Sequence, residues 1–308
     1  MPAGRVTDRF DALSRELANG RSTACIVLRH HTPVFAWGDA GRPSSVASVR
    51  KSLIGALYGI HVAEGRIDPD ATLAGIGLDD RLGLTALEKT ATIRDLLSAR
   101  SGVYHPSVHD TQRGRPARGA HPPGTHWFYN NWDFNALGAI FNRLTGADLF
   151  EAFAERIAGP LGMQDFHTGD CRYQHGPESL HPVYKMRLSA RDLARFGQLY
   201  LNGGAWLGRR ILDRDWIAES TRSHSPLGGG RGYGYLWWTA EPHAPGDALS
   251  VDTAIYYASG YGGQYIVVVP DLDAVVVHRA ANVDNGIDHA AMGRLLSLAI
   301  KALREEDR

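Results

Sequence analysis

The sequence is poor in cysteine and has neither an excess of one charge nor a long apolar run. The two cysteines, Cys25 and Cys171, lie far apart, which favours reduced thiols over a disulfide. The longest uncharged apolar stretch, residues 52–63, is too short to cross a bilayer. Basic and acidic residues number 33 each, so the charge balance predicts neither a nucleic acid nor a membrane as partner. The charged N-terminus lacks the apolar core of a signal peptide, and we expect a cytoplasmic protein.

Strand patterns lie at both ends of the chain, and helical patterns lie in the middle. The first part predicts a helix over 7–19, a β-hairpin over 23–41 and a helix over 48–65. Residues 66–215 have the patterns of helices and loops. The last part predicts these elements: strands over 233–239, 254–259, 264–269 and 274–279, then a helix over 286–304.

These patterns predict an α/β (α+β) fold with one antiparallel sheet built from both chain ends. The terminal helices flank the sheet, and an all-helical insertion forms a second lobe. We therefore expect residues 1–65 and 216–308 to form the sheet domain. Residues 66–215 would form the inserted helical domain.

Ser48 and Lys51 are the first candidate catalytic residues. Lysine is scarce in this chain, occurring only at positions 51, 89, 185 and 301. Residues three apart on a helix share a face, so Lys51 would lie beside Ser48. Burial and the positive helix end would lower the pKa of Lys51, and a neutral amine can take the serine proton. A capping serine followed by a solvated lysine is the alternative interpretation.

A second candidate group is Tyr129-Asn130-Asn131. The Tyr129 hydroxyl would relay a proton to the leaving group, and Asn131 would either hold the substrate carbonyl or orient Lys51. A competing match at Tyr200 lies on a helical pattern and is expected in the core.

The third candidate lies in "YYASGYGGQYIVVVP", residues 256–270, which predicts two strands around a glycine-rich turn. A backbone N–H at this turn, at Tyr261, would join that of Ser48 in an oxyanion hole. Ser259 and Gly260 belong to the same candidate substrate-binding group. An ordinary hairpin turn would give the same pattern.

In this order, "SVRK", "YNN" and "ASG" resemble the motifs of the serine β-lactamase and penicillin-binding-protein superfamily, whose first motif is S-x-x-K. The branch with a Y-x-N second motif is the most similar, and it includes class C β-lactamases, esterases and nylon-oligomer hydrolases. The resemblance implies catalysis by Ser48, Lys51 and Tyr129, with the active site between the two domains. It implies no metal and no organic cofactor. Whether Lys51 or Tyr129 is the general base stays open.

One position departs from that family. Its third motif usually begins with lysine or histidine, whereas Ala258 stands here. The cation that would bind the carboxylate of a penicillin is therefore missing. An arginine in the stretch 113–118 is the first candidate to replace it.

We expect a hydrolase that cleaves a small-molecule ester or amide through an acyl-enzyme on Ser48. An acyltransferase would use the same residues, and a silent ligand-binding relative is the alternative from another class.

His105 and His109 are four residues apart, but the proline between them argues against a metal-binding helix. Six aromatic residues are candidates for an aromatic pocket, with core packing as the alternative: Trp127, Phe128, Trp132, Trp237, Trp238 and Tyr261.

Overall fold

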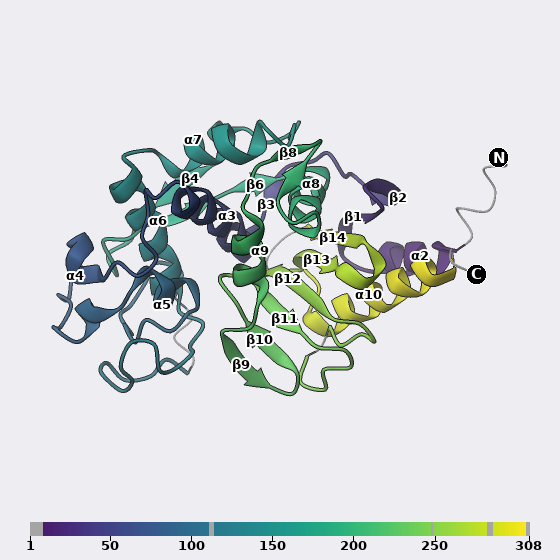
Figure 1. The fold of residues 1–308 in the computed structure, drawn as a ribbon. Helices are drawn as coiled ribbons and strands as arrows, with labels where there is room; N and C mark the ends of the chain where they lie inside the picture. The colour runs from purple at the N-terminus through teal and green to yellow at the C-terminus, as the bar shows by residue number, and fades with distance from the viewer. Residues whose placement is uncertain (1–8, 111–113, 248, 282–285, 306–308) are drawn as a thin grey trace.

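A computed structural model describes residues 9–110, 114–247, 249–281 and 286–305. Its central feature is an eight-stranded sheet in the order β2-β1-β14-β13-β12-β11-β10-β9, with antiparallel neighbours throughout. The strands are β1 (Ser22–Arg29), β2 (Thr32–Gly38), β9 (Ser225–Gly228), β10 (Arg231–Tyr233), β11 (Trp238–Ala240), β12 (Ile255–Gly260), β13 (Gln264–Val269) and β14 (Ala274–Ala280). The N-terminal pair β1–β2 thus joins six strands from the C-terminal part, as Figure 1 shows, which confirms the predicted sheet.

The middle strands are buried on both faces. Every residue of β13 is buried, and its side chains alternate between two apolar clusters: Ile266 and Val268 belong to one, and Val267 and Val269 to the other. Side chains of a strand point alternately to its two faces. The valine-rich runs therefore form a sheet that is covered on both sides.

The terminal helices α2 (Asp11–Asn19) and α10 (His289–Arg304) cover one face and lie side by side in Figure 1. The predicted first helix ends before Gly20 as expected, and residues 1–8 lie outside the described part of the chain. Helix α8 (Ala190–Leu201) covers the other face. It comes so close that a Cβ on Gly197 would lie 2.6 Å from Val275 Cγ1.

Helices are the main regular structure in the middle of the chain, but the insertion that was expected to be all-helical also contains short strands. The helices are α3 (Arg50–Ala63), α4 (Leu73–Ile76), α5 (Ile93–Leu97), α6 (Asn131–Thr145), α7 (Leu149–Phe153) and α9 (Arg214–Thr221). The helical turns are η1 (Ala47–Val49), η2 (Glu88–Thr90), η3 (Ala154–Ala158), η4 (Thr168–Asp170) and η5 (Pro270–Leu272). Three two-stranded ribbons pair β3 (Ser44–Ser45) with β6 (Arg187–Leu188), β4 (Arg172–Gln174) with β5 (Val183–Lys185), and β7 (Ala205–Trp206) with β8 (Arg209–Arg210).

The predicted strand over 233–239 is wrong in one respect, because the chain breaks there into β10 and β11. Gly234 lies against α9, where a Cβ would be 2.2 Å from the Ser220 carbonyl oxygen. Leu236 has a left-handed backbone, with φ of 63°, and its N–H donates to Leu97 O. Contacts with other elements thus override the local strand pattern.

Among the helices of the described residues, none is long and apolar enough to cross a membrane.

Candidate active site

Ser48 lies in the helical turn η1, directly before α3. The preceding residue, Ala47, has a left-handed backbone with φ of 46°, which is strained for a residue with a Cβ. The end of β12 packs against this turn: a Cβ on Gly260 would lie 2.5 Å from Val46 O. Gly260 therefore lets the strand approach the serine turn.

The buried side chain of Lys51 contacts the other three candidate residues of the site. Its Nζ donates to Tyr129 OH at 2.6 Å and to Asn131 Oδ1 at 3.0 Å, and it lies 2.8 Å from Ser48 Oγ. Among the described residues, no carboxylate forms an ion pair with Lys51. The structure thus brings together four residues that the sequence singled out, from two distant segments of the chain.

The electrostatic surroundings favour a neutral amine on Lys51. Burial lowers the pKa of Lys51 well below its usual 10.5, and the positive charge of Arg50 lowers it further. Burial raises the pKa of Tyr129, although the hydrogen bond with Ser48 and the charge of Arg50 oppose this. These directions favour a neutral Lys51 amine and a protonated Tyr129 phenol.

The start of α6 fixes the orientation of Asn131. The preceding residue, Asn130, caps the helix by accepting from the N–H of Trp132. Asn131 Nδ2 donates to His109 O at 2.8 Å, so its Oδ1 is turned toward Lys51. His109 has a left-handed backbone, with φ of 58°. Asn131 was expected either to hold the substrate carbonyl or to orient Lys51, and this geometry favours the second role. The part of His109 in this arrangement was missed, because no sequence pattern marks a backbone carbonyl.

The third candidate group is only partly brought to this site. Strand β11 pairs with Ile255–Tyr257 of β12, so the last three residues of β12 are paired with β13 alone. Ser259 lies opposite Tyr265 in that pairing. The side chain of Tyr261 is exposed. The backbone N–H of Tyr261 as an oxyanion donor stays a prediction.

At the position of the missing cation, Ala258 is buried among apolar residues. The arginines expected to replace it are already paired in the described part of 113–118. Arg115 forms an ion pair with Asp110, and Arg118 forms one with Glu88. Arg113 lies outside the described residues.

Aromatic side chains pack around Tyr129. Its ring stacks on the Trp238 ring with 5.5 Å between the ring centroids. The Trp127 ring packs edge-on against Trp238, with 5.8 Å between the centroids. Tyr233, which the sequence analysis did not select, lies 5.9 Å from Trp127 and 5.0 Å from Trp238. We call these four residues the aromatic cluster. Of the six predicted candidates, Trp127 and Trp238 belong to it.

The other aromatic candidates and the histidines lie elsewhere. The candidates fully buried in the core are Trp132 and Trp237. Tyr200 is buried on α8 as expected. His105 is buried with its Nε2 3.3 Å from Glu88 Oε1, whereas His109 contacts Gln174. The described residues contain no cluster of three or more metal-binding side chains.

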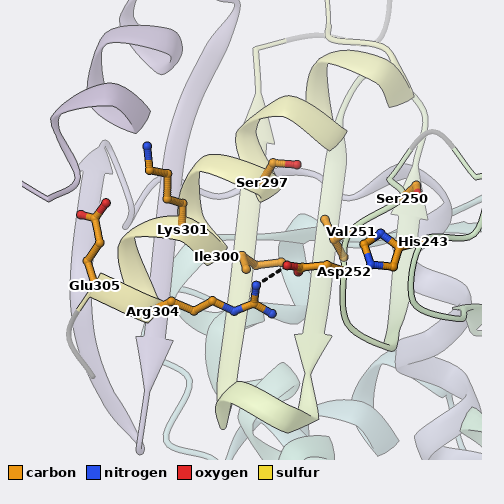
Figure 2. A pocket seen from close by; sticks show the side chains of 9 residues that line it. All are labelled: His243, Ser250, Val251, Asp252, Ser297, Ile300, Lys301, Arg304 and Glu305. Carbon is orange, nitrogen blue, oxygen red and sulfur yellow. Dashed lines mark hydrogen bonds and ion pairs between the residues drawn. The ribbon is translucent and has the colours of Figure 1, made fainter. Parts of the chain in front are cut away.

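A separate hollow of about 460 Å³ lies beside α10 (Figure 2). Its lining includes Lys301, His243 and Arg304, whose guanidinium forms an ion pair with Asp252. None of the predicted site residues lines this hollow, so it is not part of the site around Ser48.

A family model described as Beta-lactamase matches residues 11–298. The chain belongs to the beta-lactamase family. Two curated relatives are a 6-aminohexanoate-dimer hydrolase of Paenarthrobacter ureafaciens, 27% identical, and penicillin-binding protein 4 of Amycolatopsis lactamdurans, 25% identical. The first match covers 68% of this chain and 59% of that hydrolase, and the second covers 91% and 84%. The chain thus spans less than two thirds of the first relative.

Solved structures confirm the beta-lactamase-like fold. The octameric penicillin-binding protein homologue from Pyrococcus abyssi superposes with a TM-score of 0.70 at 17% identity, over 96% of this chain and 77% of that chain. EstCE1, a hydrolase with promiscuous acyltransferase activity, superposes with a TM-score of 0.68 at 17% identity, over 97% and 98%. The chain therefore has the beta-lactamase-like fold.

Proposed function

We propose that this protein is a serine hydrolase that cleaves an ester or amide through an acyl-enzyme on Ser48. The observation that carries the proposal is the set of contacts around Lys51 Nζ. One buried amine meets the Ser48 hydroxyl, the Tyr129 hydroxyl and the Asn131 amide within 3.0 Å. This arrangement joins a nucleophile to its base, with a third group orienting the base.

The reaction begins when the neutral Lys51 amine takes the Ser48 hydroxyl proton, while Oγ bonds to the substrate carbonyl carbon. The carbonyl electrons move to its oxygen, which the backbone N–H groups of Ser48 and Tyr261 stabilise. As the tetrahedral intermediate collapses, Tyr129 gives its proton to the leaving group and regains one from Lys51. Water then repeats these steps on the acyl-serine, releasing the acid and restoring the free hydroxyl.

The site is proposed to lie between the two domains, 1–65 with 216–308 and 66–215. Ser48 and Lys51 come from the first, and Tyr129 and Asn131 from the second, which supports this division. The proposal includes a cytoplasmic location, with which the two unpaired cysteines are consistent.

The substrate is proposed to be an ester or amide that places no carboxylate at Ala258. Ala258 offers no cation there, and the aromatic cluster provides an apolar wall beside Tyr129. A D-aminopeptidase of Brucella anthropi, 28% identical over 45% of this chain, joins the aminohexanoate-dimer hydrolase among the relatives. The names of these two relatives support an amide as the substrate.

Acyl transfer is the second candidate function, and the promiscuous acyltransferase activity of EstCE1 favours it. An amine or alcohol would then replace water in the second half of the reaction. The retained contacts among Ser48, Lys51 and Tyr129 argue against a silent ligand-binding protein.

The test is turnover of 4-nitrophenyl butyrate by the purified protein, with and without an added acceptor amine. Hydrolysis predicts butyrate as the product under both conditions, whereas acyl transfer predicts the butyramide of the acceptor. A fluorophosphonate should label the wild-type protein and leave Ser48→Ala unlabelled. Absence of both turnover and labelling would contradict the proposal and favour the silent relative.

A further inference from the structure

The ribbon β4–β5 places two cations directly opposite each other. Arg172 pairs with Lys185 in the strand register. Like charges in such cross-strand positions destabilise a ribbon. Among the described residues, no carboxylate forms an ion pair with either side chain. Partial burial lowers the pKa of Lys185, and the charges of Arg172 and Arg50 add to this effect.

A third cation, Arg50, is buried in the protein interior, close enough for its charge to act on Lys185. Its side chain is only 8% exposed, and its guanidinium lies over the Tyr184 ring, 5.0 Å from the centroid. Nη1 donates to Ala47 O at 3.0 Å, while the buried Nε has no hydrogen-bond partner. Burying a charge is costly unless it is paired, and Arg50 has no acidic partner among the described residues.

Arg50 borders the nucleophile directly, and the chain at Lys185 runs past the same turn, because the next residue, Met186, accepts a hydrogen bond from the Val46 N–H at 3.2 Å. Arg50 is the residue before Lys51 and is hydrogen-bonded to the residue before Ser48. Tyr184, on which Arg50 stacks, is the strand neighbour of Lys185. The ribbon is held beside the site because the Tyr184 ring packs on Gly138 of α6, where a Cβ would lie 2.6 Å from Tyr184 Cδ1.

We propose that Lys185 and Arg172, backed by Arg50, form an anion subsite that binds a carboxylate of the substrate beside Ser48. This inference rests on the proposed hydrolase function and names its substrate class: an ester or amide that carries a second, ionised carboxyl group. The subsite supplies the positive charge that Ala258 lacks, at a different place in the site. A planar guanidinium and an ammonium facing each other suit the two oxygens of a carboxylate.

The experiment uses two pairs of substrates that differ only in one charge. Mono-4-nitrophenyl adipate is compared with its methyl ester, which places the charge on the acyl side. 4-Acetoxybenzoate is compared with its methyl ester, which places it on the leaving group. The readout is the ratio of kcat/KM between charged and neutral members, measured within each variant so that differences in the folded fraction cancel.

In the wild-type protein we expect this ratio to reach about tenfold in one of the two pairs, equivalent to about 1.4 kcal/mol. Lys185→Met and Arg172→Met should each lower it to about threefold or less, whereas Lys185→Arg should largely keep it. Lys301→Met, which removes a remote exposed lysine, is the matched control and should keep the ratio. Salt at about 1 M should reduce the wild-type preference, because it screens exposed charges.

Two results would overturn the subsite: ratios near one in both pairs for the wild type, or a preference that survives in both Lys185→Met and Arg172→Met. If the wild type turns over none of the four esters, the hydrolase proposal fails instead. Binding of adipate, followed by tryptophan fluorescence, then decides the subsite alone. At least tenfold weaker binding in Lys185→Met supports it, and equal binding contradicts it.

Discussion

Replacing Lys51 by arginine separates a proton acceptor from a fixed positive charge. Lys51 Nζ meets three polar groups within 3.0 Å in a buried position, and burial favours its neutral form. A guanidinium has a pKa above about 12, so arginine keeps the charge but cannot accept the Ser48 proton. Lys51→Arg should therefore lose activity about as severely as Lys51→Ala.

The expected loss is that of general-base assistance, about 10²–10⁴-fold in kcat, or roughly 3–5 kcal/mol of barrier. The assay is hydrolysis of 4-nitrophenyl butyrate from pH 5 to 10. The wild-type kcat/KM should rise with pH as Lys51 loses its proton, at a pH well below 10.5. This rise should be absent from the residual activity of Lys51→Arg.

The larger guanidinium also risks overpacking, which typically costs about 1–3 kcal/mol of stability. Thermal unfolding of the variant therefore accompanies the kinetics, and exposed Lys301→Arg is the matched control. Retention of more than about a tenth of wild-type turnover, above the range for a lost general base, would refute the reasoning. Tyr129 as phenolate would then be the better candidate for the base.

Three further outcomes are expected. Tyr129→Phe removes the hydroxyl 2.6 Å from Lys51 and should lower kcat about 10²–10⁴-fold, and a loss of less than about fivefold would remove Tyr129 from the proton path. Benzylpenicillin turnover should be negligible beside that of 4-nitrophenyl butyrate because Ala258 supplies no cation, and equal efficiencies in a spectrophotometric comparison would contradict this. Burial lowers the pKa of His278 from 6.5 to about 4 in the folded protein. As the pH falls, His278 is therefore protonated in the unfolded chain before it is protonated in the folded protein, which favours unfolding. The free energy of unfolding in urea should therefore drop by about 2 kcal/mol from this residue between pH 7 and pH 5, and His278→Gln should show a correspondingly smaller drop.

Local patterns were sufficient for the sheet and for the proximity of Ser48 to Lys51. The runs that became β13 and β14 are short, valine-rich and bounded by turns, and both form strands as predicted. Ser48 and Lys51 share a face because one helical turn separates them, which sequence spacing alone determines. The second motif was found through residue type, but its approach to Lys51 over 78 positions depends on tertiary packing.

Features set by contacts between distant segments could not be predicted. The strain at Ala47 is imposed by its surroundings, since alanine ordinarily avoids a φ of 46°. The short pairing of Arg172 with Lys185 has too few residues to show a strand period. The break at Gly234 follows from its contact with Ser220 on α9, which no local pattern encodes.

The central claim is that Ser48 forms the covalent intermediate. Intact-protein mass spectrometry after brief exposure to a slowly deacylated 4-nitrophenyl ester tests it most directly. We expect one added acyl group per chain, mapped by peptide sequencing to the peptide that contains Ser48 and absent from Ser48→Ala. An adduct on another residue, or full turnover by Ser48→Ala, would contradict the account.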